Sequence, residues 1–256
     1  MPYIVKTKND KIIFPHHTVF MIECDCEFIP YERGLIEMKL NQYFDHTLLK
    51  PEATSAQVKT LCEEAKQYNF YAICVNSSMV PTAYEALKGS DVKIAAVVGF
   101  PLGTCTTSTK VFETEEACKT GAKEIDMVLH LGKLKEGEWE YVSADIAAVV
   151  WAASHYGAIV KVILETCQLS DEEIIRACQV AEEAGAAFVK TSTGFGSGGA
   201  TAHHVALMKK SVSESVQVKA SGGIRDYKTV MEMIEAGADR IGASASVAVM
   251  KEAEEK

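Results

Sequence analysis

The sequence predicts a closed α/β barrel of the (β/α)8, or TIM barrel, class with a parallel eight-stranded sheet. From Met38 onward, short apolar or β-branched runs alternate with amphipathic stretches of helical period, the pattern of parallel strands joined by helices. The chain has 256 residues, and such a barrel typically needs about 250. Three segments repeat the order helix end, glycine, strand: TGAKEIDMV, AGAAFVKTS and AGADRIGAS. A doubly wound open sheet remains the alternative, because it produces the same alternation.

Each element can be placed in chain order. The strands are expected at Gln42–His46, Tyr71–Asn76, Lys93–Gly99, Glu124–His130, Ile159–Thr166, Phe188–Ser192, Gln217–Ser221 and Arg240–Ala243. The helices are expected at Thr54–Tyr68, Val80–Lys88, Thr107–Thr120, Glu138–His155, Asp171–Ala184, Thr201–Lys210 and Asp226–Ala236. Two helix starts carry recognisable signals: Ser170 with Glu173 forms a capping box, and Pro81 lies in a first turn.

The beginning of the chain does not share this pattern. Residues 1–37 mix short apolar runs with Pro15 and Pro30 and show no sustained period. We predict an N-terminal extension over residues 1–37 and a barrel domain over 38–256. The extension is either an ordered β-rich appendage or, as its lack of period favours, a loose segment upstream of a start at Met38. Its Cys24 and Cys26 form a C-x-C pair, a weak metal-binding signal.

Composition indicates a globular protein of the cytoplasm. The net charge is −9, from 26 basic and 35 acidic residues, which argues against nucleic acid or an anionic membrane as a partner. No apolar run approaches the ~20 residues of a membrane span, and no secretory signal is present. The eight cysteines lack a disulfide or C-x-x-C pattern, which is typical of free thiols in a reducing compartment.

Charged residues recur inside the predicted strands. Lys161, Lys190 and Lys219 are each the third residue of an apolar run, and successive lysines are 29 residues apart. Asp126 holds the same place in EIDMV, and Glu165 is expected on the face of its strand that carries Lys161. One such lysine is usually a snorkelling residue. Three in register beside a carboxylate, in a sheet covered on both faces, predict a functional cluster at a similar height in the barrel.

Clustered ammonium groups have a chemical use. Burial and a neighbouring cation both lower the pKa of a lysine from its usual ~10.4. The neutral amine can then attack a carbonyl and form a Schiff base, with a second lysine as pKa depressor and proton carrier. An aspartate can act as the general acid and base. This chemistry needs no metal or other cofactor, and we expect none.

Glycine-rich segments follow the last three predicted strands: GFGSGG, SGGIR and IGASAS. In barrels of this class, these loops and a short helix N-terminus commonly bind phosphate through backbone N–H groups. A single such run is often only a flexible loop. Three at successive strand ends predict a phosphate site, to which Ser244 or Ser246 can add a hydroxyl.

These motifs are similar to those of a known family. DHTLLKPEAT, VVGFPLG, EIDMV, KVILET, FVKTSTGF, VKASGGIR and RIGAS resemble, in order and spacing, the motifs of deoxyribose-phosphate aldolase, from about Met38 to the last helix. The resemblance implies a (β/α)8 barrel that cleaves 2-deoxy-D-ribose 5-phosphate reversibly to D-glyceraldehyde 3-phosphate and acetaldehyde. It also implies a small phosphorylated sugar as the only partner besides a second copy, because the family often forms homodimers.

The resemblance further implies residue roles. Lys190 matches the Schiff-base lysine, Asp126 the aspartate of the proton relay and Lys219 the lysine that perturbs the nucleophile, while Lys161 is a supporting charge. The matching positions of the remaining site are Asp45 and Cys74 on the first two strands and, at the phosphate, Gly194, Gly222, Gly223 and Ser244.

The sequence departs from the family pattern at two places. Some members end in a tail whose terminal tyrosine assists proton transfer, whereas this chain stops at MKEAEEK. Phe195 follows TSTG where other members carry a lysine, so one cation at the phosphate is missing.

Three other functions stay open at this level. A Schiff-base barrel with another donor, such as a transaldolase or a larger ketose aldolase, would use the same lysines. A non-catalytic phosphate-binding regulator would need the glycine loops but not the lysine–aspartate set. A metal-dependent aldolase would need a ligand pattern, which the seven histidines lack; His203 and His204 open a helix and are expected to face solvent or neighbour its cap.

Overall fold

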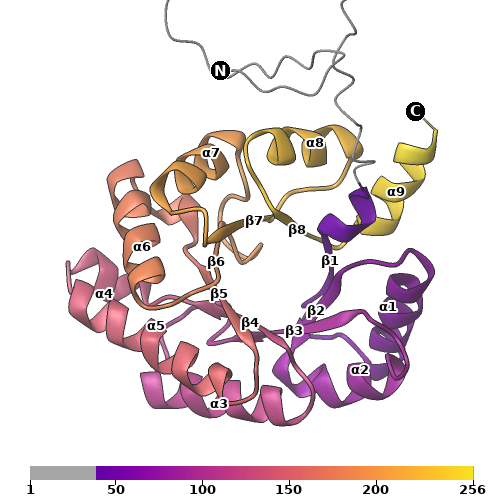
Figure 1. Ribbon diagram of the computed structural model, residues 1–256, viewed down its shortest axis with the longest axis horizontal. Helices are drawn as coiled ribbons and strands as arrows, with labels where there is room; N and C mark the ends of the chain where they lie inside the picture. Colours follow the sequence, from indigo (N-terminus) through magenta and orange to yellow (C-terminus); the bar gives the residue numbers. More distant parts are fainter. Residues whose placement is uncertain (1–38, 256) are drawn as a thin grey trace, which may run out of the picture. The chain divides into compact units, whose positions relative to one another are not determined.

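The computed structural model describes residues 39–255, in which eight strands form a closed parallel barrel ringed by helices (Figure 1). The strands are β1 Phe44–Leu48, β2 Ala72–Asn76, β3 Lys93–Val98, β4 Glu124–Val128, β5 Ile159–Ile163, β6 Phe188–Lys190, β7 Gln217–Ser221 and β8 Arg240–Ala243. Each strand pairs with the next one along the chain, and β8 returns to β1 through Phe44 opposite Ile241. This closure confirms the predicted (β/α)8 class and excludes the open doubly wound sheet.

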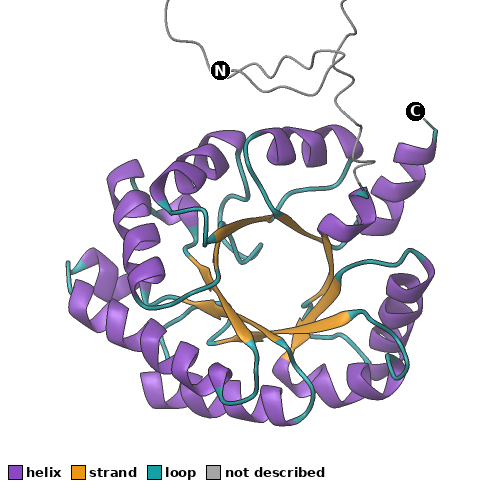
Figure 2. Cartoon of the chain, in the orientation of Figure 1, coloured by secondary structure: helices purple, strands orange, loops and turns teal. Residues whose placement is uncertain are grey.

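Helices form the outer layer of the barrel (Figure 2). The α-helices of residues 39–255 are α1 Ser55–Gln67, α2 Val80–Ala86, α3 Thr107–Lys119, α4 Leu131–Lys135, α5 Trp139–Ser154, α6 Asp171–Glu183, α7 Ala202–Ser211, α8 Tyr227–Glu235 and α9 Ser246–Glu254. Short 3-10 turns lie at η1 Leu40–Tyr43, η2 Ser77–Met79 and η3 Thr166–Gln168. The short helix α4 was not predicted. None of these helices is both long and apolar enough to cross a membrane.

Local signals explain where the elements begin and end. The Ser170 hydroxyl accepts from the N–H of Glu173, whose side chain in turn accepts from the N–H of Ser170, so the predicted capping box opens α6. Gly121, Gly185 and Gly237, the glycines of the three repeated segments, all have positive φ and end the preceding helices.

Six of the eight strand predictions differ from the observed strands by one to three residues at an end, whereas Gln217–Ser221 and Arg240–Ala243 are confirmed; two of the differences have a clear local cause. The first strand begins at Phe44 rather than Gln42, because residues 40–43 form η1. The fifth strand ends at Ile163 rather than Thr166, because Glu165 has a left-handed backbone with φ 57°. The expectations for residues 1–37, including Cys24 and Cys26, lie outside the described residues.

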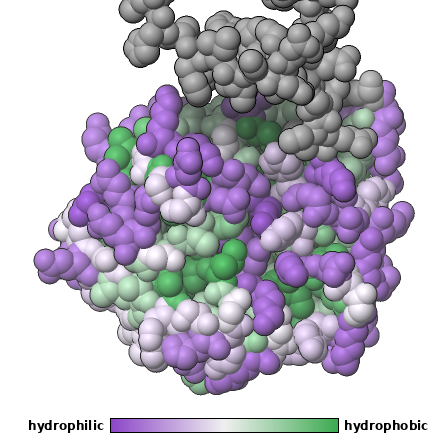
Figure 3. Space-filling model, viewed as in Figure 1, coloured by the Kyte–Doolittle hydropathy of each residue, from purple (hydrophilic) through white to green (hydrophobic). Residues whose placement is uncertain are grey.

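The hydrophobic core has two parts. A large cluster fills the space between the strands and the helices, and a small one inside the barrel comprises Leu49, Cys74, Ala95 and Val97, with Phe100 packed against it. Seen end-on, hydrophobic side chains gather toward the middle of this face and hydrophilic ones surround them (Figure 3). The apolar patch inside the barrel covers the side of β2 and β3. Charged side chains occupy the opposite side.

Candidate active site

The charged side chains project into the barrel from successive strands. Lys190 is the last residue of β6 and pairs with Lys219 on β7, while Asp126 on β4 pairs with Lys161 on β5. Lys161 pairs with Phe188 rather than with Lys190, so the three lysines are not in one continuous register. All four side chains are buried, with Lys190 2% exposed.

Asp126 is the centre of this cluster. Its Oδ2 accepts from Lys190 Nζ at 2.8 Å and from Lys219 Nζ at 2.7 Å, and its Oδ1 accepts from Lys161 Nζ at 2.7 Å. The predicted lysines therefore converge on one carboxylate. Because a carboxylate buried without partners is strongly destabilised, these contacts explain how Asp126 can be fully enclosed.

A second group of charges lies beside the first. Asp45 accepts from Lys219 through Oδ2 and from Arg240 through Oδ1, the latter at 2.8 Å. Glu124 contacts Lys161 Nζ at 2.5 Å and Arg240 at 3.3 Å. The Arg240 guanidinium lies 3.6 Å from the centre of the Tyr71 ring, a cation–π contact. Asp45 and Lys161 therefore lie within this group of charged side chains.

The environment of Lys190 lowers its pKa. Burial is the main cause, because it disfavours the charged amine; the Lys219 ammonium acts in the same direction, and Asp126 opposes both. Lys219 differs: burial would lower its pKa, but Asp126 and Asp45 outweigh burial and raise it. The pKa values of the two opposed lysines therefore move in opposite directions, and the neutral amine is favoured at Lys190 but not at Lys219.

The pKa values of Asp45 and Asp126 are both lowered by the cations around them. Burial would raise the pKa of Asp126, but Lys161, Lys190 and Lys219 together hold it well below its usual range. The cluster has three carboxylates, Asp45, Glu124 and Asp126, against four cationic side chains, the three lysines and Arg240. Loss of the Lys190 charge leaves three carboxylates facing three cationic side chains, and the pKa of Lys190 is lowered in that direction. Charge balance and the pKa directions therefore agree.

Cys74 lies between the charged and apolar sides of the barrel. Its Sγ is 3.9 Å from Asp126 Oδ2, and burial, with Asp126 adding to it, raises the pKa of the thiol to about 11. A protonated, buried thiol is a packing group rather than a nucleophile.

The glycines predicted to bind phosphate lie at the strand ends. Gly194, Gly222 and Gly223 all have positive φ, and a Cβ built on Gly222 would be 3.6 Å from Gly194 Cα. Ser221 pairs with Gly242, so Gly223 and the exposed Ser244 each follow a paired position by two residues. Ser246 opens α9 and donates its hydroxyl to Ala243 O, which occupies that donor. Backbone N–H groups and Ser244 are thus the groups at hand for an anion.

Phe195 has an uncharged side chain at the edge of the glycine-rich loop. Its ring is 52% exposed and contacts Phe100 edge-on, with centroids 5.3 Å apart. Phe195 lines a pocket of about 280 Å³ together with Pro101, Leu102, Leu131, Gly132, Lys135, Glu165, Gln168, Thr193 and Gly196. At the position where the resemblance implies a cation, this chain therefore has an uncharged aromatic ring that packs on Phe100.

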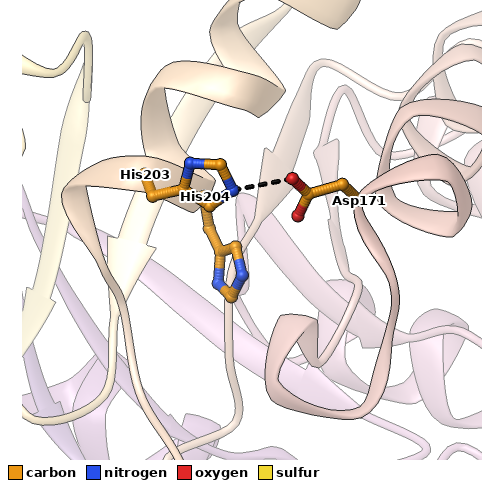
Figure 4. Close-up of side chains that lie close together, drawn as sticks. All are labelled: Asp171, His203 and His204. Atoms are coloured by element: carbon orange, nitrogen blue, oxygen red, sulfur yellow. Dashed lines mark hydrogen bonds and ion pairs between the residues drawn. The ribbon is translucent and has the colours of Figure 1, made fainter.

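Two histidines meet a carboxylate outside this cluster. The three residues are His203 and His204 at the start of α7 and Asp171 at the start of α6, and one potential metal-ligand atom from each lies within 4.8 Å of the others. His203 Nε2 contacts Asp171 Oδ2 at 2.8 Å (Figure 4). Sequence spacing missed this group because its members come from two helices. The helix N-termini there disfavour a cation, and the pairing of Asp171 with His203 already accounts for both groups. The set shares no residue with the lysine cluster.

Comparison with known proteins identifies the family of this chain. The model of the DeoC/LacD family of aldolases matches residues 39–251. The chain belongs to this aldolase family. The deoxyribose-phosphate aldolase of Caldanaerobacter subterraneus subsp. tengcongensis is 58% identical over 216 residues, covering 84% of this chain and 94% of the relative. That of Streptococcus sanguinis is 58% identical over 214 residues, covering 84% and 96%. The tetrameric deoxyribose phosphate aldolase of Aeropyrum pernix superposes with a TM-score of 0.79 at 34% identity, covering 84% and 91%.

The aldolase contains site residues that sequence reasoning missed. Glu124 and Arg240 complete the charge cluster, and strand alternation could have found Glu124, which is two residues before Asp126. Glu165 was predicted to share the face of Lys161, and this was wrong: it lies beyond β5 and binds Thr193 instead. The six cysteines of residues 39–255 are all free thiols.

Proposed function

We propose that this aldolase cleaves 2-deoxy-D-ribose 5-phosphate reversibly to D-glyceraldehyde 3-phosphate and acetaldehyde, through a Schiff base on Lys190 and without a metal. The observation that carries the proposal is a buried lysine with a lowered pKa between a carboxylate and a second lysine. The substrate is the one for which the relatives are named.

The first half of the reaction makes the Schiff base. The neutral Lys190 amine adds to the C1 aldehyde of the open-chain sugar, and the resulting carbinolamine loses water to give an iminium. Loss of water needs a proton on the departing hydroxyl. Lys219 can supply it, because its raised pKa keeps it protonated and it shares Asp126 with Lys190.

The second half breaks the C2–C3 bond. Asp126, as the general base, takes the C3 hydroxyl proton, so that C3 becomes the aldehyde of glyceraldehyde 3-phosphate and the bonding electrons pass to C2 and the iminium to form an enamine. Protonation of C2 and addition of water then release acetaldehyde and restore the amine. Asp126 also holds Lys190 and Lys219 in place for these proton transfers. Lys161 contacts Asp126 directly, whereas Asp45 contacts Lys161 and Lys219, and Arg240 contacts Asp45.

The phosphate end of the substrate would bind at the other side of the mouth. Gly194, Gly222 and Gly223 present backbone without side chains, and Ser244 adds an exposed hydroxyl beside the start of α9. Phe195 contributes no charge, so we expect phosphate to be held mainly by N–H groups.

A trapping experiment tests the proposal. Borohydride reduction in the presence of acetaldehyde is expected to leave a stable two-carbon adduct on Lys190, located by peptide mass spectrometry. Dihydroxyacetone as the donor should trap poorly if the enzyme is not a transaldolase or ketose aldolase. Full activity of Lys190→Ala, an adduct on another lysine, or loss of activity in EDTA would each overturn part of the assignment.

The remaining expectations stay proposals. We propose a homodimer in the cytoplasm, with the phosphorylated sugar as ligand and neither nucleic acid nor membrane as partner. The relative from Aeropyrum pernix is tetrameric, so sedimentation equilibrium of the full chain is the direct measurement.

A further inference from the structure

Glu165 has an unusual backbone at the mouth of the barrel. Its φ of 57° places a non-glycine residue in the left-handed region, where few such residues occur. The sheet ladder slips at the same point: the N–H of Leu164 donates to Lys190 O, but the N–H of Thr166 donates to Thr191 O, one residue further on instead of two. Such a bulge re-aims a side chain, and bulges are common beside active sites.

The re-aimed carboxylate is buried and makes specific contacts. Glu165 is 5% exposed and forms no ion pair among residues 39–255. The Thr193 hydroxyl donates to its Oε2, and the Thr193 N–H donates to its Oε1 at 3.3 Å. The Cys167 thiol also approaches Oε1, at 3.8 Å, so Thr193 and Cys167 are the hydrogen-bond donors to a buried carboxylate that has no ion pair among residues 39–255.

Thr193 passes this constraint to the next turn. Its Oγ1 also accepts from the N–H of Phe195 at 3.0 Å, so the hydrogen bonds run from Phe195 through Thr193 to Glu165. Between them lies Gly194, whose φ of 85° sets its peptide beside Gly222. The turn at Gly194 is therefore flanked on both sides by residues that hydrogen bonds connect to Glu165.

The rest of the glycine loop packs against the same segment. A Cβ on Gly196 would lie 3.2 Å from Glu165 Cδ, and one on Gly198 would lie 3.0 Å from Cys167 Cβ. These two glycines thus serve close approach to residues 165–167, whereas Gly194 supplies a left-handed turn. The glycine-rich loop therefore packs directly against the bulge at Glu165.

We propose that Glu165 is a positioning residue that sets affinity for the phosphorylated substrate. Acting through Thr193, it holds the turn at Gly194 in the form that presents its N–H to phosphate, and it does not touch the reacting carbonyl. The inference rests on the proposed function for its substrate. It adds a residue that determines the preference for phosphorylated over unphosphorylated 2-deoxyribose.

Substitution of Glu165 tests this role. Glu165→Ala is expected to raise KM for deoxyribose 5-phosphate about ten-fold or more while kcat changes little. KM for unphosphorylated 2-deoxyribose and the rate of acetaldehyde trapping on Lys190 should stay near the wild-type values. Glu165→Gln keeps an oxygen acceptor for Thr193 and should recover much of the lost affinity. Glu172→Ala, an exposed glutamate on α6, is the matched control and should change none of these quantities.

Other measurements keep the inference separable from the proposed function. If Glu165→Ala does not fold, Thr193→Val removes the same hydrogen bond and should show the same split. Calorimetric binding of inorganic phosphate reports on the turn without any chemistry, and it should weaken in both variants even if wild-type protein traps no acetaldehyde. The inference is overturned if both substrates and trapping fall equally, or if the preference for phosphate is unchanged.

Discussion

Lys190 Nζ donates to Asp126 Oδ2 at 2.8 Å, and Lys219 Nζ donates to the same oxygen at 2.7 Å. One carboxylate oxygen therefore joins two lysines whose pKa values move in opposite directions. Asp126 raises the pKa of both, and Lys219 lowers that of Lys190. The pKa of Lys190 thus depends on its burial, on the Asp126 carboxylate and on the Lys219 ammonium, and a substitution can remove each of the two charges separately.

Lys219→Met should move the pH dependence of Schiff-base formation to higher pH. Lys190 reacts as the free amine, so its reaction rate rises with pH through its pKa. Loss of the neighbouring ammonium removes a contribution that lowers this pKa, and the rising limb of trapping rate against pH should shift upward. Loss of the proton carrier should also lower kcat/KM about 10²- to 10⁴-fold.

Lys219→Arg is the matched control for charge. It keeps a cation opposite Lys190, so the rising limb should stay near the wild-type position even though proton transfer is impaired. A rising limb that moves to lower pH in the methionine variant would contradict this account of Lys190.

Gly199→Ala should weaken phosphate binding by a steric route. A Cβ at this position would overlap the carbonyl of Gly222, which must then move. We expect KM for deoxyribose 5-phosphate to rise about ten-fold in steady-state assays, with acetaldehyde trapping nearly unchanged.

Gly89→Ala provides the comparison for Gly199. Gly89 has φ 78°, but no atom lies within 4 Å of the place that a Cβ would take there, so alanine should cost about 1 kcal/mol of stability through backbone strain alone. Its KM should equal that of the wild type. An equal KM in the Gly199 variant would show that Gly222 does not contact phosphate.

A buried ion pair away from the cluster should contribute to stability and not to activity. Lys110 Nζ on α3 contacts Asp145 Oδ2 on α5 at 2.5 Å, both at most 1% exposed. Asp145→Ala should lower the free energy of unfolding, measured in urea, by about 3–5 kcal/mol because it strands a buried ammonium. The double variant Lys110→Met, Asp145→Leu should recover most of this loss. A fall in kcat/KM of the folded single variant would instead link the pair to the site.

The barrel and much of the cluster could be predicted from sequence for a physical reason. A lysine inside a strand that is covered on both faces has no route to solvent, so its partners must lie inside the barrel with it. Three such strands predict that Lys161, Lys190 and Lys219 lie together inside the barrel, and a fourth strand adds Asp126 to this group. Alternation carries this information only while the strand stays regular.

Glu165 shows where that information ends. Strand alternation predicts that Glu165 shares a face with Lys161, but its own left-handed backbone directs its side chain to Thr193. No local sequence signal marks that bulge. The sequence places Arg240 at the start of a strand but does not indicate its partners, because Asp45 and Glu124 lie on strands far away in the chain. Such pairings depend on barrel closure, which a single sequence does not reveal.

Charge balance in the cluster predicts that removing the nucleophile stabilises the fold. The pKa of Lys190 is lowered from 10.5 in the folded protein, so at pH values below 10.5 the unfolded chain holds this proton more tightly and folding loses free energy. Lys190→Met leaves three carboxylates facing three cations. We expect the inactive variant to be about 1 kcal/mol more stable at neutral pH in urea unfolding. Because the wild type gains stability as pH rises toward 10.5, the difference should narrow there.

Asp126→Asn should have the opposite effect on stability. Three lysines would lose their shared anion, and stranding buried charge should cost about 3 kcal/mol at neutral pH. The pKa of Asp126 is held well below 3.8, so its contribution is fully present above about pH 4 and is lost as pH falls through the folded-state pKa. The gap between wild type and variant should therefore close in acid. If Asp126→Asn had as little effect on the free energy of unfolding as Lys190→Met, the cluster would be stabilised by packing rather than by charge balance.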